Sequence, residues 1–251
     1  MRFLIRFSYD GTNFKGYQRQ DGYRTIQKEL EDALKKINDS KDVKVVASGR
    51  TDKGVHALDQ VAHLDIDVNI TPYKLKRALN SNLSDEIHIN SAYEVKDDYF
   101  VRYNVLKKEY RYYINMGEFN PVMRNYIYQH CYPLNVVEMK KAIKYFVGEH
   151  DFRAFVTENV VKENCVRTIY EAYINCKGDI LEFVFVGNGF LRYQVRNMVG
   201  ALIKVGTGKI SADLVKEILD SKVRGKNGAT AKACGLYLFK TTLKEDKWLE
   251  F

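Results

Sequence analysis

The chain has 251 residues, of which 45% are hydrophobic, and it carries a formal net charge of +8. The apolar content excludes a disordered chain. The absence of any apolar run of about 18 residues, together with Arg2 and Arg6 in the first apolar stretch, argues against a membrane span or signal peptide, so we expect a cytoplasmic protein. The positive charge favours a polyanionic partner, because each neutralised phosphate releases condensed counterions.

The first half of the chain alternates between strand and helix patterns. Residues 3–9 are typical of a strand. Thr25 is suited to cap a helix whose apolar residues recur at helical spacing, namely Ile26, Leu30, Ala33, Leu34 and Ile37. The β-branched stretch 43–47 predicts a second, short strand.

A third strand is predicted at 61–68, where apolar residues alternate with His63, Asp65 and Asp67. The alternation implies that these three side chains face water. Pro72 is typical of a first helical turn and opens a second helix, and residues 87–95 alternate again as a strand. The predicted order is β-α-β-β-α-β.

The second half repeats this order. Its elements are a strand at 110–114, a helix at 136–147, a hairpin of 168–174 and 181–186 around Lys177-Gly178-Asp179, a helical stripe at 191–202, an extra helix near 213–219 and a strand at 235–242. We therefore expect an α+β protein with two tandem ferredoxin-like halves, residues 1–105 and 106–251. Their strands would form a mixed sheet with a central basic cleft.

The segment Ser48-Gly49-Arg50-Thr51-Asp52-Lys53-Gly54-Val55-His56 lies between two predicted strands and is expected to be a loop. Glycine at both flanks permits a tight turn, and the cationic neighbours of Asp52 favour its ionised form, a usable nucleophile or proton acceptor. On residue types alone, an Asp that caps turn amides is the better interpretation. The Lys-Ser/Thr of a phosphate-binding loop is missing.

The motif Gly49-Arg50-Thr51-Asp52-Lys53-Gly54-Val55-His56-Ala57 resembles the catalytic loop of the TruA family of tRNA pseudouridine synthases, whose superfamily requires this Asp. The resemblance covers most of the chain. It includes Tyr9-Asp10-Gly11, Gly16-Tyr17-Gln18-Arg19-Gln20, Gln60-Val61-Ala62-His63, Lys108-Glu109-Tyr110-Arg111-Tyr112, Gly148-Glu149-His150-Asp151-Phe152, Val195-Arg196-Asn197-Met198-Val199-Gly200 and Gly235-Leu236-Tyr237-Leu238.

Two places depart from the family. Tyr17 stands where Trp is usual, and Tyr99-Phe100-Val101-Arg102-Tyr103 stands where Phe-His-Ala-Arg-Phe is common. Phe100 lacks the hydrogen bonds of His, so this change bears on an RNA contact and on the target position. It leaves Arg102 and Asp52 unchanged.

The resemblance implies an isomerase that converts uridine to pseudouridine at positions 38–40 of the tRNA anticodon stem-loop, without metal or cofactor. It implies that Asp52 attacks C1′ of the ribose or removes the proton at C2′, and the sequence does not decide between these steps. Tyr110 would stack on the uracil, and Arg196 would pair with Asp52. Arg50 would fill the space of the flipped base or contact a phosphate.

RNA binding is expected to rest on a set of basic residues, Arg19, Arg24, Lys53, Arg102, Lys107, Lys108 and Arg111. As a set they predict an affinity that falls steeply with salt. The resemblance also implies a homodimer with one tRNA crossing both subunits. Three alternatives remain: the same chemistry on ribosomal RNA or another tRNA site, a non-catalytic RNA-binding protein, and a metal-dependent nuclease using Asp52, His63, Asp65 and Asp67.

Overall fold

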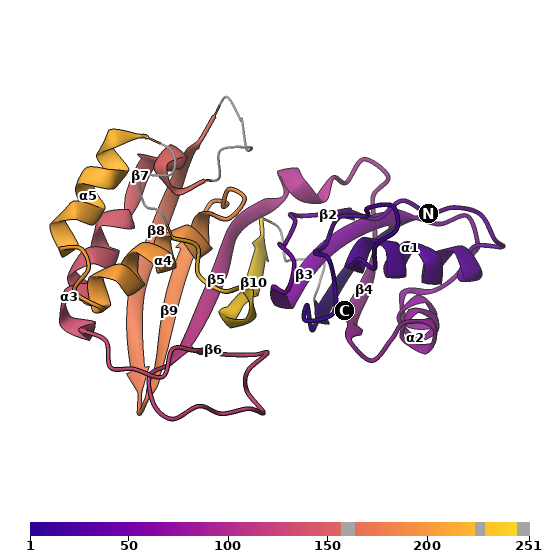
Figure 1. Ribbon diagram of the computed structural model, residues 1–251. Helices are drawn as coiled ribbons and strands as arrows, with labels where there is room; N and C mark the ends of the chain where they lie inside the picture. The colour runs from indigo at the N-terminus through magenta and orange to yellow at the C-terminus, as the bar shows by residue number, and fades with distance from the viewer. Residues whose placement is uncertain (157–163, 224–228, 245–251) are drawn as a thin grey trace. The chain divides into compact units, whose positions relative to one another are not determined.

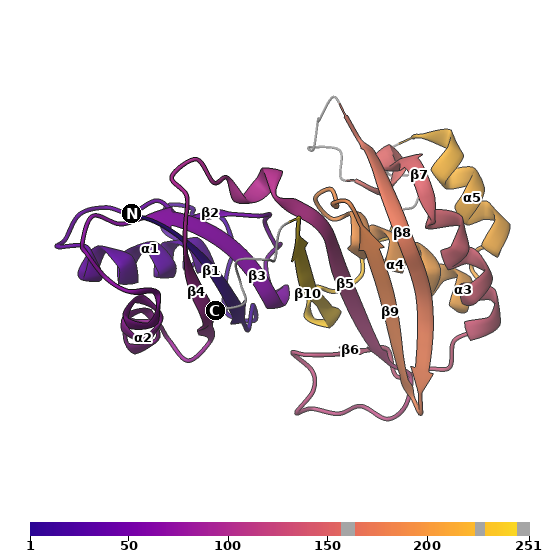
Figure 2. The same ribbon diagram turned by 180° about the vertical axis from the view of Figure 1, so that it is seen from behind.

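The chain folds into two compact units by its internal contacts. One comprises Met1–Leu106 together with the chain from Leu238 on, and the other comprises Lys107–Tyr237. The last strand therefore begins in the second unit and ends in the first. The computed structural model describes residues 1–156, 164–223 and 229–244 (Figures 1 and 2).

The first unit has the predicted order of elements. They are β1 (Arg2–Tyr9), α1 (Ile26–Ile37), β2 (Val46–Ala47), β3 (His56–Asp65), α2 (Pro72–Asn82), β4 (Ile87–Val95) and the 3-10 turn η1 (Val101–Tyr103). β1 lies between β3 and β4 and is antiparallel to both, and β2 pairs with β3 on its other side. The strand order β4-β1-β3-β2, with α1 packed against α2, is that of a ferredoxin-like half.

Local signals set the two helices of this unit. The Thr25 side chain accepts the backbone N–H of Lys28 at the start of α1, and Thr71 caps α2 in the same way ahead of Pro72. The predicted apolar face of α1 is buried at Ile26, Leu30, Ala33 and Leu34. Burial of such a face against the sheet is what stabilises a helix of this length.

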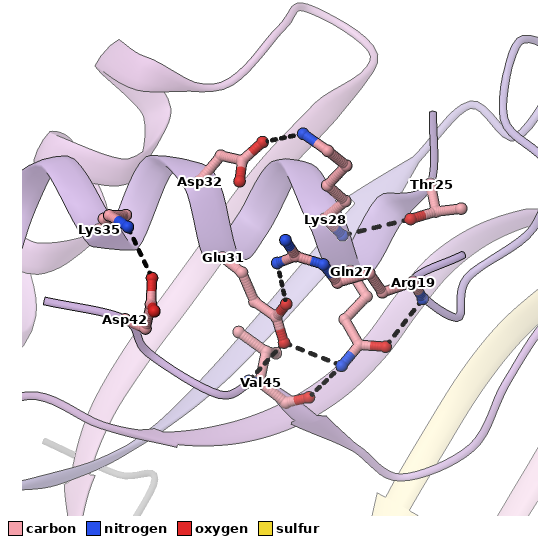
Figure 3. Close-up of polar contacts among 9 residues, drawn as sticks. All are labelled: Arg19, Thr25, Gln27, Lys28, Glu31, Asp32, Lys35, Asp42 and Val45. Atoms are coloured by element: carbon pink, nitrogen blue, oxygen red, sulfur yellow. Dashed lines mark hydrogen bonds and ion pairs between the residues drawn. The ribbon is translucent and has the colours of Figure 1, made fainter. Parts of the chain in front are cut away.

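The second and third strands differ from the prediction. The predicted strand 43–47 shrinks to two residues, because the backbone of Val45 bonds to side chains of α1: its N–H to Glu31 and its C=O to Gln27 (Figure 3). The third strand is His56–Asp65 rather than 61–68. Its pairing partner β1 begins at Arg2, opposite Asp65, and the pairing ends one residue further on, where Met1 and Ile66 exchange two backbone hydrogen bonds of 3.0 Å.

His63 does not face water as the alternation implied. It is 4% exposed, its Nδ1 accepts the Val101 N–H at 3.4 Å, and its ring lies edge-on to Phe100 at 5.0 Å between centroids. η1 therefore covers the face of β3 that the sequence pattern assigned to solvent. Burial, with the nearby guanidinium of Arg2, lowers the pKa of His63 to about 4.

This buried imidazole predicts acid sensitivity. In the unfolded chain His63 takes up a proton near pH 6.5, whereas in the fold it does so only near pH 4. The contribution of neutral His63 to the free energy of unfolding is therefore fully present above pH 6.5. It is lost as the pH drops from 6.5 towards 4, by at most about 1.4 kcal/mol per pH unit. We expect urea unfolding of His63→Gln to depend less steeply on pH in this window than the parent; equal slopes would contradict the prediction.

The second unit carries more elements than its predicted repeat. They are β5 (Val105–Asn115), β6 (Tyr128–Gln129), α3 (Val136–Ile143), η2 (Lys144–Phe146), β7 (Gly148–Asp151), η3 (Phe152–Phe155), β8 (Val166–Lys177), β9 (Ile180–Gly187), α4 (Gln194–Gly206), α5 (Ala212–Ser221), η4 (Ala233–Gly235) and β10 (Leu236–Leu243). The strands follow the order β5-β9-β8-β7, and β6 runs parallel to β5. The three helices pack on one another over one face of these strands (Figure 1).

The predicted hairpin is confirmed, with Gly178 at a φ of 56° in its turn. The predicted helix 136–147 ends early: α3 stops at Ile143, and Lys144–Phe146 form a 3-10 turn that still buries Phe146. β6 and β7 were not predicted. The α+β class and the tandem repeat of the family fold are nevertheless confirmed. The division at residues 105 and 106 and the basic cleft stay predictions.

No helix among residues 1–156, 164–223 and 229–244 combines the length and the apolar character needed to span a membrane.

Candidate active site

The loop that carries Asp52 is anchored at its start by β3. The backbone N–H of Ser48 donates to the carbonyl of Val61 at 2.8 Å. The fully buried Gln60 accepts the Ser48 hydroxyl at 2.9 Å and donates its amide to the Gly49 carbonyl at 3.2 Å. One buried amide side chain therefore holds the backbone that leads into the loop.

The turn at Asp52 is closed by its own backbone. The N–H of Val55 donates to the Asp52 carbonyl at 3.2 Å, and Gly54 has a φ of 75°, which glycine adopts without strain. The buried Thr51 hydroxyl lies 2.8 Å from the Tyr9 hydroxyl. Burial raises the pKa of Tyr9 to about 12, so the phenol stays protonated at neutral pH and keeps this hydrogen bond.

A second segment, Gly16-Tyr17, supports the same turn. The Tyr17 N–H donates to the Thr51 carbonyl at 3.1 Å. Gly16 has a φ of 101°, and a Cβ there would lie 3.0 Å from the Thr51 carbonyl oxygen and 3.2 Å from the Lys53 nitrogen. Only glycine suits this approach, so the backbone on both sides of Asp52 is fixed.

The fixed turn places Asp52 at the border between protein and solvent. Its side chain is half-buried, whereas the flanking Arg50 and Lys53 are exposed. A carboxylate in such a position meets a ligand from solvent, and the two cations supply charge beside it. The loop is therefore suited to nucleophilic or proton-abstracting chemistry on an anionic substrate.

Two of the predicted catalytic residues lie in the second unit. Tyr110, in β5, is 8% exposed and meets Phe190 edge-on at 5.1 Å between ring centroids. Arg196, in α4, donates its Nε to the Ala231 carbonyl at 2.8 Å, and its guanidinium lies 5.1 Å from the ring centre of Tyr193. These contacts of Tyr110 and Arg196 all lie within the second unit. The pairing of Arg196 with Asp52 stays a prediction.

Comparison with known proteins identifies the family. The profile of the tRNA pseudouridine synthase family matches residues 6–104 and 142–242, which is most of the chain. The chain belongs to this family. A protein named tRNA pseudouridine synthase A from Anoxybacillus flavithermus is 44% identical over 238 residues, covering 95% of this chain and 97% of its own. The protein of that name from Streptococcus agalactiae is 43% identical over 249 residues, covering 98% and 96%.

Among solved structures, a chain from a Cbf5-Nop10-Gar1 complex matches 94% of this chain and 58% of its own, at 12% identity and a TM-score of 0.35. This score is too low to support an argument.

In this member of the family, two arginines expected at the RNA already have carboxylate partners. Arg19 donates to Glu31 at 2.9 Å (Figure 3), and Arg24 donates to Glu29 at 2.5 Å and pairs with Glu86. Both guanidinium groups remain partly exposed. They help to hold the segment that leads to α1, and their contacts with RNA stay a prediction.

The other basic residues predicted to bind RNA differ in exposure. Arg102 and Lys107 are exposed, and Arg102 donates its Nε to the Ala47 carbonyl at 3.1 Å. Lys108 is only 7% exposed. Arg111 is bound by two carboxylates, those of Glu109 and Glu182, at 2.7 and 2.8 Å. Arg102, Lys107 and the loop residues Arg50 and Lys53 are thus the exposed cations of the predicted set, and their contacts with RNA stay a prediction.

The two departures from the family have structural consequences. The Phe100 ring lies 5.0 Å from both the His63 and the Tyr103 ring centres, an apolar contact in place of the hydrogen bonds of a His. Tyr17 is 2% exposed, and its hydroxyl has no hydrogen-bond partner among the described residues. Burial raises the pKa of Tyr17 well above its usual range. Tyr17 contacts the loop through its N–H at Thr51, whereas Phe100 packs against His63 of β3 and against Tyr103.

The side chains that a nuclease would use have other partners. Asp65 is held by Arg2 through two bonds of 2.7 and 2.8 Å, and Asp67 by Lys41 at 3.0 Å. His63 faces the Val101 backbone. Within the described ranges, no group of three His, Cys, Asp or Glu side chains is arranged to hold a metal ion.

Proposed function

We propose that the chain isomerises uridine to pseudouridine in tRNA, at positions 38–40 of the anticodon stem-loop. One observation carries the proposal: the family match spans both halves and retains Asp52 on a rigid, half-exposed loop between cations. Pseudouridine formation breaks the N1–C1′ bond, turns the uracil and forms a C5–C1′ bond; the C5–H bond then breaks, and in the net reaction N1 gains the proton that C5 loses. It transfers no electrons and no group to a second molecule, so side chains alone suffice.

In this proposal the four catalytic residues act at different parts of the nucleotide. The uridine leaves its stack, which costs a few kcal/mol, and its ribose meets Asp52. Asp52 attacks C1′ or removes the C2′ proton, and Arg196 keeps the carboxylate ionised. Tyr110 holds the detached uracil by stacking while it turns. Arg50 contacts phosphate or fills the vacated space.

The direct test is product mapping on RNA made without modifications. The purified chain is incubated with tRNA transcripts that carry uridine at 38, 39 or 40, and pseudouridine is located by carbodiimide labelling and primer extension. We expect product at these positions, loss of product when that uridine is cytidine, and undiminished turnover in a chelator. Product only in ribosomal RNA or at another tRNA site would favour the alternative substrate. Metal-dependent strand cleavage would favour the nuclease.

Tyr110 is predicted to act mainly through its ring. Tyr110→Phe keeps the stacking face and should retain most activity, whereas Tyr110→Leu should lose on the order of tenfold or more in kcat. Tyr110→Leu also removes a buried ring from its contact with Phe190 and should lower stability, so rates are compared at a temperature where both variants are folded. Single-turnover rates on the same transcript measure the difference. Equal losses in both variants would show that the hydroxyl, not the ring, carries the effect.

We further propose that the protein is cytoplasmic, as its sequence pattern suggests, and that it forms a homodimer that binds one tRNA across two subunits, as the family resemblance implies. Light scattering of the chain alone and with tRNA measures both masses. A dimer that takes up one tRNA supports the proposal, and a monomer at working concentration contradicts it.

A further inference from the structure

Three rings form a row on the second unit, outside the predicted site. Tyr128 lies in β6, which runs beside β5 (Figures 1 and 2), and His130 and Tyr132 follow it. The Tyr128 and His130 rings are 5.9 Å apart, the His130 and Tyr132 rings 6.1 Å, and both pairs meet edge to face. We call Tyr128, His130 and Tyr132 the aromatic row.

The backbone holds this row in place. The N–H groups of His130 and Cys131 both donate to the Asn115 carbonyl at 3.0 Å. Cys131 has a φ of 64°, which a residue with a side chain adopts only at a cost in free energy. The chain therefore keeps a strained residue between two ring-bearing positions, and the rings are preorganised before any partner arrives.

The row is open to solvent at its Tyr132 end, whereas Tyr128 and His130 are half-buried, and two lysines lie near it. Tyr132 is 70% exposed. The ammonium of the exposed Lys232 lies 5.3 Å from the Tyr128 ring centre. Burial, together with the positive charge of Lys209, lowers the pKa of His130, so its ring is neutral at physiological pH. Among the described residues, no carboxylate pairs with Lys232 or Lys209.

The row also starts beside a predicted catalytic residue. Lys232 follows Ala231, whose carbonyl accepts Arg196 Nε at 2.8 Å and whose N–H donates to the Arg196 carbonyl at 3.0 Å. From Arg196 the surface leads through Lys232 to Tyr128, His130 and Tyr132, all within one unit. An RNA segment bound beside Arg196 therefore meets Lys232 next, and then the rings of the row.

We propose that the aromatic row, with Lys232 and Lys209, binds the unpaired nucleotides that adjoin the target uridine in the substrate RNA. Flat rings take up unstacked bases, and the ammonium groups take up phosphate. This chemistry favours RNA over a protein partner, because a protein docking patch is depleted of lysine at its core. The inference rests on the proposed function and names the part of the substrate that this surface recognises.

Tyr132 gives the sharpest test, because its exposure makes it dispensable for folding. We expect Tyr132→Ala to raise KM for the tRNA transcript about five- to fiftyfold with kcat within about twofold, and Tyr132→Phe to stay near the parent. Tyr170→Ala is the matched control: Tyr170 lies on β8 of the same unit, is 47% exposed and has no ring or cation contact in the described residues. It should leave KM and kcat unchanged.

Binding is measured separately from turnover, in an Asp52→Asn background, by filter binding to the same transcript at two salt concentrations. The further change Tyr132→Ala should raise Kd by the same factor as KM, and Lys232→Gln should raise Kd and flatten its salt dependence. If neither change moves Kd beyond the Tyr170→Ala control, the inference is wrong. The inference is equally wrong if Tyr132→Ala changes the oligomeric state and leaves Kd unchanged. Failure of the proposed function would appear instead as no pseudouridine in the parent protein.

Discussion

Asp52→Ala is expected to abolish pseudouridine formation while the chain still binds tRNA. The loop backbone is held by Gln60 from β3 and by the Tyr17 N–H at Thr51. Because these contacts do not use the Asp52 side chain, its removal should leave the loop in place. The expected loss is on the order of a thousandfold or more in kcat, as for the removal of a catalytic nucleophile.

Three measurements define this result. Single-turnover kinetics give the chemical step, filter binding gives Kd, and thermal unfolding shows that the fold is intact. Asp21→Asn is the matched control, since Asp21 is exposed and pairs with no described residue; it removes a charge from the same unit and should keep parental turnover. Residual kcat within about tenfold of the parent in Asp52→Ala would defeat the assignment, because no other group is proposed to take over the step.

The first unit was predictable because its signals are local. Thr25 ahead of regularly spaced apolar residues fixes α1, and Pro72 after Thr71 fixes α2. The alternation at 87–95 matches β4 at both ends. In each case residues close in sequence determine the backbone conformation, and the tertiary packing is compatible with it.

The departures arise where distant residues compete for the backbone or cover a surface. Val45 has the residue type of a strand, yet Glu31 and Gln27 from α1 take its backbone hydrogen bonds. His63 lies in an alternating pattern, yet η1, which is some forty residues further along the sequence, packs over it and buries it. A period-2 pattern records only which residues are polar, and tertiary contacts decide whether water reaches them.

The candidate site was likewise predictable only where its signals are local in sequence. Glycines around Asp52 predicted the loop, but residue types alone favoured a turn-capping Asp, and only the resemblance to a family singled Asp52 out as catalytic. The residues that fix the loop, Tyr9 and Gln60, appeared only as family landmarks, because their hydrogen bonds to Thr51 and Gly49 join separate segments. The aromatic row had a visible signal in the alternation of Tyr128, His130 and Tyr132, whereas its cations come from elsewhere in the chain.

The close approach of Gly11 to the loop leads to the second large prediction, that Gly11→Ala costs both stability and turnover. An added Cβ would lie 2.0 Å from the Val55 carbonyl oxygen and 2.6 Å from its carbon, far inside contact distance. Both are backbone atoms, so no side-chain rotation relieves the overlap. Overpacking of this kind costs about 1–3 kcal/mol, and more where the backbone itself must shift. Urea unfolding of both proteins measures the loss.

Turnover should fall by more than the unfolded fraction explains, because Val55 also closes the turn at Asp52 and Gly11 donates its N–H to the buried His56 ring at 3.1 Å. A shift of about 1 Å at a reacting carboxylate costs on the order of a hundredfold in rate. Gly189→Ala is the control, since its new Cβ meets only the end of the Arg167 side chain at 3.9 Å. Rates are compared at a temperature where both variants are folded. A Gly11→Ala protein with parental kcat would mean that the loop yields without moving Asp52, and the rigid support inferred for this carboxylate would then be incorrect.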